Sequence, residues 1–233
     1  MIISHRYRFI FIKTHKTAGS SLEMGLGPLC AGDDIISHME TNLHTGIPRN
    51  YLPDTRLGRA YGRSRWVRKL LSRHSPLLGA YYYEHMPAWR IRELLGPEIW
   101  ASYFTFCVER NPWDKLVSYY LWKRDGQGRD MPDFKSWVMG RPKRLPLDAS
   151  LYMAGDEVLV DRVFEYRDLG AALNEVAART GFPVPAVLPG EKSGIARDRA
   201  PWPTYYDAES RARVSALFRR EIALMDYHFD AAD

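Results

Sequence analysis

The chain has 233 residues, enough for one sizeable hydrophobic core and a small subdomain. Its hydrophobic content of 45% and charged content of 26% are ordinary for a globular protein, and its net charge of +5 fits an anionic ligand without identifying one. No apolar run reaches the ~20 residues of a membrane span, and two cysteines are too few for a disulfide framework. The first residues lack the layout of a signal peptide, so we expect a cytoplasmic protein.

Strands and helices are expected to alternate along the chain. We expect apolar strands at residues 7–12, 103–109 and 163–166. We expect helices at residues 17–26, 88–95, 112–123 and 168–181, and a last helix that Asp207 caps. Residues 30–84 are irregular in pattern. This alternation predicts an α/β fold with a central, mainly parallel sheet flanked by helices.

A polar turn follows the first strand and carries groups that a phosphate needs. The turn reads Lys13-Thr14-His15-Lys16-Thr17-Ala18-Gly19-Ser20-Ser21. The N-terminus of the following helix offers free N–H groups, Gly19 permits close approach of the backbone, and hydroxyls add donors. The ammonium of Lys16 can neutralise negative charge that develops on the oxygen of a leaving group. The Walker pattern is absent, because the lysine precedes the glycine. The competing structural interpretation is a Ser/Thr-capped helix with a surface lysine.

A second polar turn follows the strand at 103–109. Arg110 ends the strand, Asn111 and Pro112 begin a helix, and Ser118 falls about two turns further on. Arginine is the natural bidentate partner of a phosphate, and Ser118 adds a hydroxyl. The structural alternative is a capped helix whose Arg110 pairs with a carboxylate. Two such strand–turn–helix units suggest a nucleotide held at both ends.

Together the two turns resemble the motifs of the PAPS-dependent sulfotransferase superfamily, in the branch of carbohydrate sulfotransferases and their many bacterial relatives. The first motif, H-x-x-K-T-x-G-[ST]-S, is matched from Lys16 to Ser21, with the histidine displaced to His15. The second, R-N-P-W-D-[RK]-L-V-S-x-Y, is matched from Arg110 to Tyr120. The resemblance implies a three-layer fold like that of P-loop NTPases. It also implies a single domain over residues 1–233, with residues 30–84 as a variable, acceptor-binding insertion.

The resemblance further implies PAPS as donor, PAP as product, and no required metal. Residues implied to bind this nucleotide are Lys13, His15, Lys16, Thr17, Ala18, Gly19, Ser20, Ser21, Arg110, Ser118 and Lys192. Lys16 would act on the leaving group. The general base is left open between His85 and its neighbour Glu84, while His15 is a less favoured candidate and His85 has a purely structural alternative. Trp113 is interpreted as a core residue more readily than as an adenine stacker.

The segment 56–74 carries seven basic residues and no acid. They are Arg56, Arg59, Arg63, Arg65, Arg68, Lys69 and Arg73. Three interpretations remain: a solvated segment, a site for an acidic glycan acceptor, or a contact with an anionic membrane that holds a lipid-linked acceptor. No nucleic-acid-binding module is recognised, so no nucleic-acid partner is expected.

The leading hypothesis is sulfuryl transfer from PAPS to a hydroxyl of a carbohydrate, in a polysaccharide or glycolipid. The first alternative is a nucleotide-dependent small-molecule kinase, which the missing Walker pattern and missing magnesium-binding aspartate disfavour. The second is a non-catalytic module on the same fold that binds a polyanion. The sequence indicates neither the acceptor nor the oligomeric state.

Overall fold

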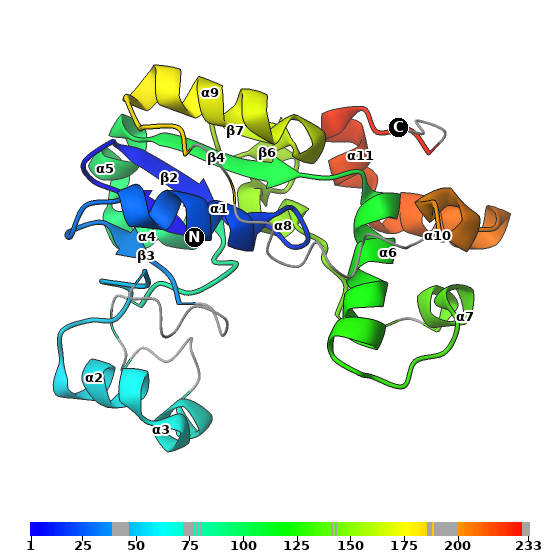
Figure 1. Cartoon of the computed structure of the whole chain (residues 1–233), viewed down its shortest axis with the longest axis horizontal. Helices are drawn as coiled ribbons and strands as arrows, with labels where there is room; N and C mark the ends of the chain where they lie inside the picture. The colour runs from blue at the N-terminus through cyan, green and yellow to red at the C-terminus, as the bar shows by residue number, and fades with distance from the viewer. Residues whose placement is uncertain are drawn as a thin grey trace.

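The computed structural model describes residues 1–38, 47–71, 77, 79, 81–140, 142, 144–185, 188 and 200–229. A five-stranded sheet with the order β3-β1-β2-β4-β7 lies at its centre (Figure 1). Its strands are β1 (Ile2–Ser4), β2 (Phe9–Ile12), β3 (Ile35–Ile36), β4 (Phe104–Glu109) and β7 (Arg162–Glu165). A separate small hairpin consists of β5 (Met153–Ala154) and β6 (Glu157–Val158).

The sheet is mixed, which corrects the expectation of a mainly parallel one. Strands β2, β4 and β7 are parallel, as the strand–helix alternation predicted. Strand β1, which the sequence pattern did not predict, pairs antiparallel with both β2 and β3. It returns directly into β2 through a tight turn in which Arg8 has a φ of 53°. The polar turns of interest follow β2 and β4, in the parallel part.

Helices make up most of the remaining described structure. They are α1 (Gly19–Leu26), α2 (Arg56–Arg63), α3 (Arg65–Leu70), α4 (Ala88–Leu95), α5 (Pro97–Ser102), α6 (Pro112–Leu121), α7 (Phe134–Met139), α8 (Ala149–Tyr152), α9 (Leu169–Thr180), α10 (Ala208–Leu217) and α11 (Arg219–Met225). A π-helical turn, η3 (Trp122–Gly126), extends α6. The expected helices at 88–95 and 168–181 are confirmed. The expected single last helix is wrong, because the backbone breaks at Phe218 between α10 and α11.

Helices cover both faces of the sheet. Alternate strand residues such as Phe9 and Phe11 pack with Leu22 of α1 and Val176 of α9. Residues between them, such as Ile10, Ile12 and Cys107, pack on the other side with α4 and α8. The strands are therefore buried on both faces, which explains their continuous apolar sequences. Within the described ranges, no helix combines the length and apolar character needed to cross a membrane.

A third hydrophobic cluster joins α6, α7 and α10 beyond the edge of the sheet (Figure 1). Trp113 is 4% exposed there and packs edge-on against Phe229, with ring centres 5.6 Å apart. Its interpretation as a core residue fits this packing. Tyr120 packs edge-on against Phe134 and thereby fixes α7 on α6.

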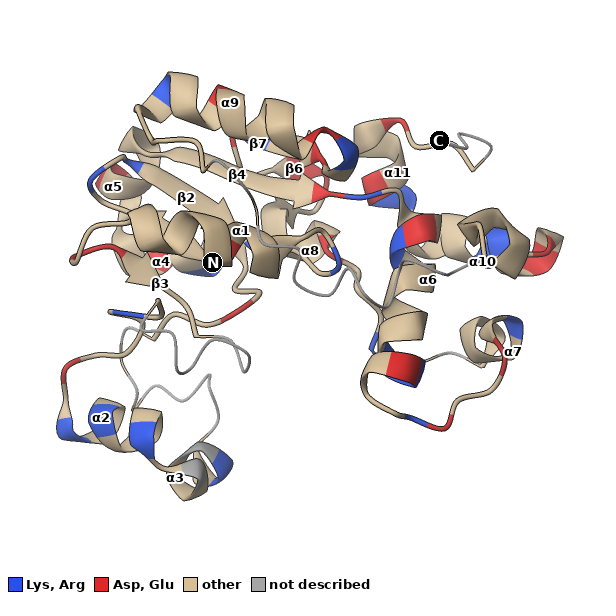
Figure 2. Ribbon diagram, viewed as in Figure 1, with Lys and Arg blue, Asp and Glu red and all other residues tan. Residues whose placement is uncertain are grey.

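Helices α2 and α3 form a basic pair away from α6 and α7, with Lys and Arg along both (Figures 1 and 2). On α3, Val67 and Leu71 pack toward the core, whereas Trp66 is 71% exposed and Leu70 is 82% exposed. The predicted basic helix is thus present, and α3 is apolar on an inner and an outer side.

Candidate functional site

The two polar turns meet at one edge of the sheet. Parallel neighbours β2 and β4 place their carboxyl ends together, so the turn after Ile12 lies beside the turn after Glu109. The guanidinium of Arg110 bridges the turns, because its Nη1 donates a hydrogen bond of 3.0 Å to the carbonyl of Lys16. Tyr166, just after β7, stacks on the same guanidinium at 4.4 Å. All three parallel strands therefore contribute to this edge.

The backbone of the first turn is left-handed at two residues other than glycine. Lys16 has a φ of 61° and Ala18 a φ of 58°, each costing about 1–3 kcal/mol. A turn that alternates left-handed and ordinary residues gathers N–H groups into a concave nest for an anion. The N-cap of α1 is Ala18, whose side chain accepts no hydrogen bond, so the Ser/Thr-capped interpretation is wrong. The left-handed backbone at the N-terminus of α1 therefore fits an anion-binding turn.

Several residues of this turn have structural partners. Lys13 is 2% exposed, and its Nζ lies 2.7 Å from Glu23 and 2.6 Å from Glu84. A Cβ atom on Gly19 would lie 2.7 Å from Cγ of Lys13, so packing against that lysine explains the glycine. Thr17 is fully buried, with its hydroxyl 2.7 Å from that of Thr14. Lys13, Thr17 and Gly19 therefore support the backbone of the turn through contacts inside the protein.

The other predicted nucleotide-binding residues of the turn are less buried, apart from Ser21. Ser21 is 6% exposed, whereas Ser20 and Lys16 are half-buried. The ammonium of Lys16 lies 5.5 Å over the ring of Trp122, at the far end of α6. Ser118 lies one turn before Trp122, whose N–H donates to its carbonyl. Trp122 thus contacts both residues, Lys16 through its ring and Ser118 through its backbone N–H. Lys192 lies outside the described residues.

Arg110 is held by a carboxylate, as the structural alternative proposed. Its Nε and Nη2 each lie 2.7 Å from Oδ2 of Asp114, and the residue is 8% exposed. Together with the bond to Lys16, these contacts use three of its five N–H groups. Two N–H groups lie beyond these contacts. The arginine is therefore oriented rigidly while keeping capacity for an oxyanion.

Two histidines are stacked beside the first turn. The rings of His15 and His85 are 3.6 Å apart and within 9° of parallel. Nδ1 of His85 donates 2.9 Å to the carbonyl of Lys13, so the neutral ring presents Nε2 as the acceptor. Burial, followed by the adjacent His15, lowers the pKa of His85 to about 3. Glu84 is also a weak base: burial is the largest effect and opposes ionisation, but Lys13 and the other positive groups around the carboxylate together lower the pKa of Glu84 to about 2.

His15 forms a carboxylate–histidine pair that sequence reasoning missed. Its Nδ1 lies 2.6 Å from Oδ1 of Asp148, and its backbone N–H donates 2.7 Å to Oδ2. The side chain of Asp148 is 1% exposed, whereas that of His15 is 36% exposed and that of His85 is 22% exposed. The sequence gives little signal for this pair, because Asp148 is far away in the chain and precedes α8 as an ordinary capping residue would.

Asp148 belongs to a buried ionic network. Nζ of Lys115 lies 2.6 Å from both Asp148 and Glu109, and the hydroxyl of Tyr152 donates 2.9 Å to Glu109. Two carboxylates share one ammonium here. Burial raises the pKa of Glu109 to about 7, although Lys115 opposes the rise. The ammonium stays charged, since Asp148 and Glu109 raise the pKa of Lys115 against the effect of burial.

No protein-family model matches this chain, and no solved structure matches it. A segment of 101 residues is 32% identical to an uncharacterized protein of Archaeoglobus fulgidus. The match covers 42% of this chain and 84% of the archaeal protein, so the chain belongs to the same family as that protein. Because the relative's name states no activity, the functional argument depends on the residues themselves.

Proposed function

We propose that this protein transfers the sulfuryl group of PAPS to a hydroxyl of a carbohydrate acceptor. The observation that carries the proposal is the bond between Arg110 and the Lys16 carbonyl, which joins the two motif-bearing turns at one sheet edge. One turn offers a strained nest at a helix N-terminus, and the other offers an oriented guanidinium. A fold of the P-loop NTPase kind and a cytoplasmic location are parts of the same proposal.

Each turn has groups for one end of the nucleotide. The amides from Ala18 to Ser21 would hold the 5′-phosphate, with the hydroxyls of the two serines nearby. Arg110 and Ser118 would hold the 3′-phosphate through the remaining guanidinium N–H groups and a hydroxyl. PAPS supplies the activated sulfuryl group when bound. Lys16 neutralises charge on the phosphate oxygen as the bond from that oxygen to sulfur breaks.

The acceptor hydroxyl loses its proton as its oxygen bonds to sulfur, and we assign this proton to Nε2 of His15. Asp148 holds Nδ1 of that ring, which fixes the tautomer and stabilises the imidazolium. His85 is the weaker candidate, because of its low pKa and because its Nε2 lies 3.6 Å from the carboxylate of Glu84. In our proposal His85 supports the His15 ring by stacking. The proposal therefore ranks His15 above His85 and Glu84 as the general base, whereas the sequence favoured His85 or Glu84.

The test is calorimetric titration with PAP and, separately, with ATP and magnesium. We expect PAP to bind to the wild type and Ser118→Ala to weaken it about tenfold, as for loss of a bond to a charged group. Arg110→Ala should abolish binding, but it also removes the bridge between the turns. Ser118→Ala is therefore the sharper variant, and Ser215→Ala on α10 is its matched control.

Two results would reject this function. One is a wild-type protein that does not bind PAP. The other is a preference for ATP with magnesium, which would favour the kinase alternative. Binding of PAP without any transfer to carbohydrate acceptors would favour the non-catalytic module.

A further inference from the structure

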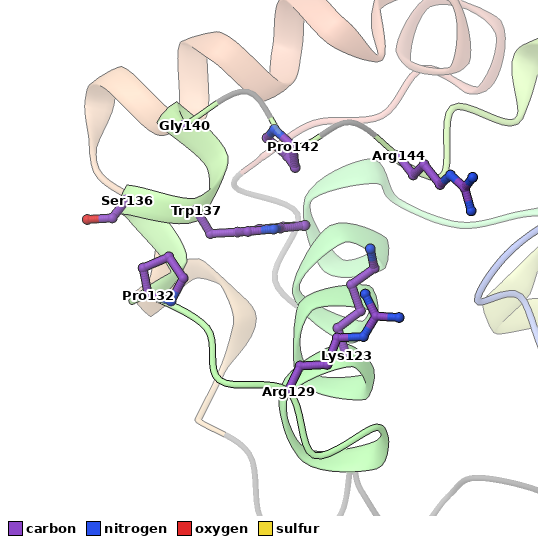
Figure 3. Close-up of a pocket in the computed structure, with 8 residues that line it drawn as sticks. All are labelled: Lys123, Arg129, Pro132, Ser136, Trp137, Gly140, Pro142 and Arg144. Carbon is purple, nitrogen blue, oxygen red and sulfur yellow. The ribbon is translucent and has the colours of Figure 1, made fainter.

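A pocket of about 570 Å³ lies beside α6, outside the two motif turns (Figure 3). It is formed by η3, by the segment between η3 and α7, by α7 and by the segment that follows α7. The lining residues are Lys123, Arg129, Pro132, Ser136, Trp137, Gly140, Pro142 and Arg144. A cavity of this size fits a small part of a larger ligand, such as one or two sugar rings.

The lining of the pocket is cationic and aromatic. Lys123, Arg129 and Arg144 contribute three positive charges, and no carboxylate is among the lining residues. Figure 3 shows the charged ends of Lys123 and Arg129 close together beyond one end of the Trp137 indole, with that of Arg144 further away in the same direction. A hollow lined by one sign of charge concentrates oppositely charged ligands. Two guanidinium groups add the planar donors that fit carboxylate, sulfate or phosphate.

Aromatic contacts connect this pocket to Lys16. The Lys16 ammonium lies 5.5 Å over the Trp122 ring, and Trp122 precedes the lining residue Lys123. The Tyr119 ring lies 5.7 Å from that of Trp122 and 6.4 Å from that of Trp137, and the Lys123 ammonium lies over it at 4.7 Å. The rings of Tyr119 and Trp122 therefore connect the pocket residue Trp137 to the lysine assigned to the leaving group. A long acceptor could contact the pocket and still extend toward that lysine.

We propose that this pocket binds an acidic sugar unit of the acceptor. The anionic group, whether carboxylate or sulfate, would lie among Lys123, Arg129 and Arg144, with the apolar face of the ring against Trp137. This inference rests on the proposed sulfotransferase function. It places acceptor recognition in residues 123–144, whereas the sequence resemblance placed it in residues 30–84.

The test compares three oligosaccharides of equal length: neutral, carboxylated and sulfated. Binding is measured for the wild type, for Arg129→Ala and for Trp137→Ala, and PAP is titrated against each protein. We expect the acidic sugars to bind at least about tenfold more tightly than the neutral one, and each variant to lose about tenfold. The PAP affinity should stay unchanged. The relative strength of the carboxylated and sulfated sugars identifies the anionic group.

Arg124→Ala is the matched control, because it removes one positive charge from the same segment. Arg124 pairs with Asp125 at 2.6 Å and does not line the pocket. Equal losses in Arg124→Ala and Arg129→Ala, or equal binding of neutral and acidic sugars, would overturn the pocket assignment. If PAP binds but the pocket variants keep acidic-sugar affinity, only this inference fails. If acidic sugars bind through the pocket but PAP does not bind, only the sulfotransferase proposal fails.

Discussion

His85 is neutral near physiological pH because burial and the adjacent His15 ring lower its pKa to about 3. In the unfolded chain, the same imidazole takes a proton near its ordinary pKa of about 6.5. Its contribution to stability is therefore complete above about pH 6.5 and is lost as the pH falls toward 3, by at most about 1.4 kcal/mol per pH unit. We expect His85→Asn to lose less stability than the wild type between about pH 7 and pH 5.

Urea denaturation at several pH values measures this difference in slope. Glu109 has the opposite effect, because its raised pKa lets the folded state hold a proton that the unfolded state releases. That contribution is present in both proteins and cancels from the comparison. If the free energy of unfolding of the wild type and of His85→Asn changed equally with pH, His85 would have the same pKa in the folded and the unfolded chain. That result would contradict the expectation.

Single residues also show how far the sequence could predict the site. Lys16 and Arg110 were predicted because strand–turn–helix chemistry is local and can be read from neighbouring residues. Asp148 was not, because its partner His15 is distant in the chain and only the fold brings them together. The resemblance likewise predicts Lys13 as a nucleotide-binding residue, but the sequence does not reveal that Glu23 and Glu84 pair with its ammonium.

Helix α3 is apolar on an outer side that faces no described part of the molecule. Trp66 and Leu70 are one helical turn apart and therefore lie on the same side, and both are more than two-thirds exposed. Exposed basic residues Arg63 and Lys69 lie next to them. An exposed tryptophan and leucine among basic residues are typical of binding to an anionic membrane surface. This observation favours the membrane interpretation of segment 56–74 over the solvated one.

We therefore expect the protein to cosediment with vesicles that contain anionic lipid and to remain in solution with neutral ones. The double variant Trp66→Ala with Leu70→Ala should lose most of this binding, because about 2–4 kcal/mol of apolar transfer is removed. The control is Trp89→Ala on α4, where the tryptophan is 53% exposed. Equal binding by the double variant would contradict membrane insertion by α3 and leave only charge attraction.

At the scale of elements, the sequence predicted what depends on local pattern. The long helices and the parallel strands have clear periodicity and clear caps, such as Asp207 before α10. Strand β1 was missed because its three residues are too few to show a period. The break at Phe218 was missed because the apolar pattern continues through it, and burial of that side chain is a tertiary effect.

The ionic network of Glu109, Lys115 and Asp148 ties the sheet, α6, α8 and the first turn into one unit. Lys115 is fully buried, and its ammonium is shared by two carboxylates at 2.6 Å. Removing it leaves both acids buried without their cation. We expect Lys115→Met to lower the free energy of unfolding by about 3–5 kcal/mol, as for breaking a buried ion pair from one side.

Urea denaturation of three proteins separates lost charge balance from lost packing. Lys135→Met removes a half-exposed lysine that pairs with Asp207, and should change the stability far less than Lys115→Met, because water screens this pair. Adding Glu109→Gln to Lys115→Met should restore part of the stability, because one uncompensated carboxylate becomes neutral. If the double variant were no more stable than Lys115→Met, the loss of stability would come from the packing of the lysine side chain and not from its charge. Since Asp148 also holds His15, we expect Lys115→Met to slow any sulfuryl transfer more than it weakens PAP binding, and comparing the two measurements tests whether the network positions the base.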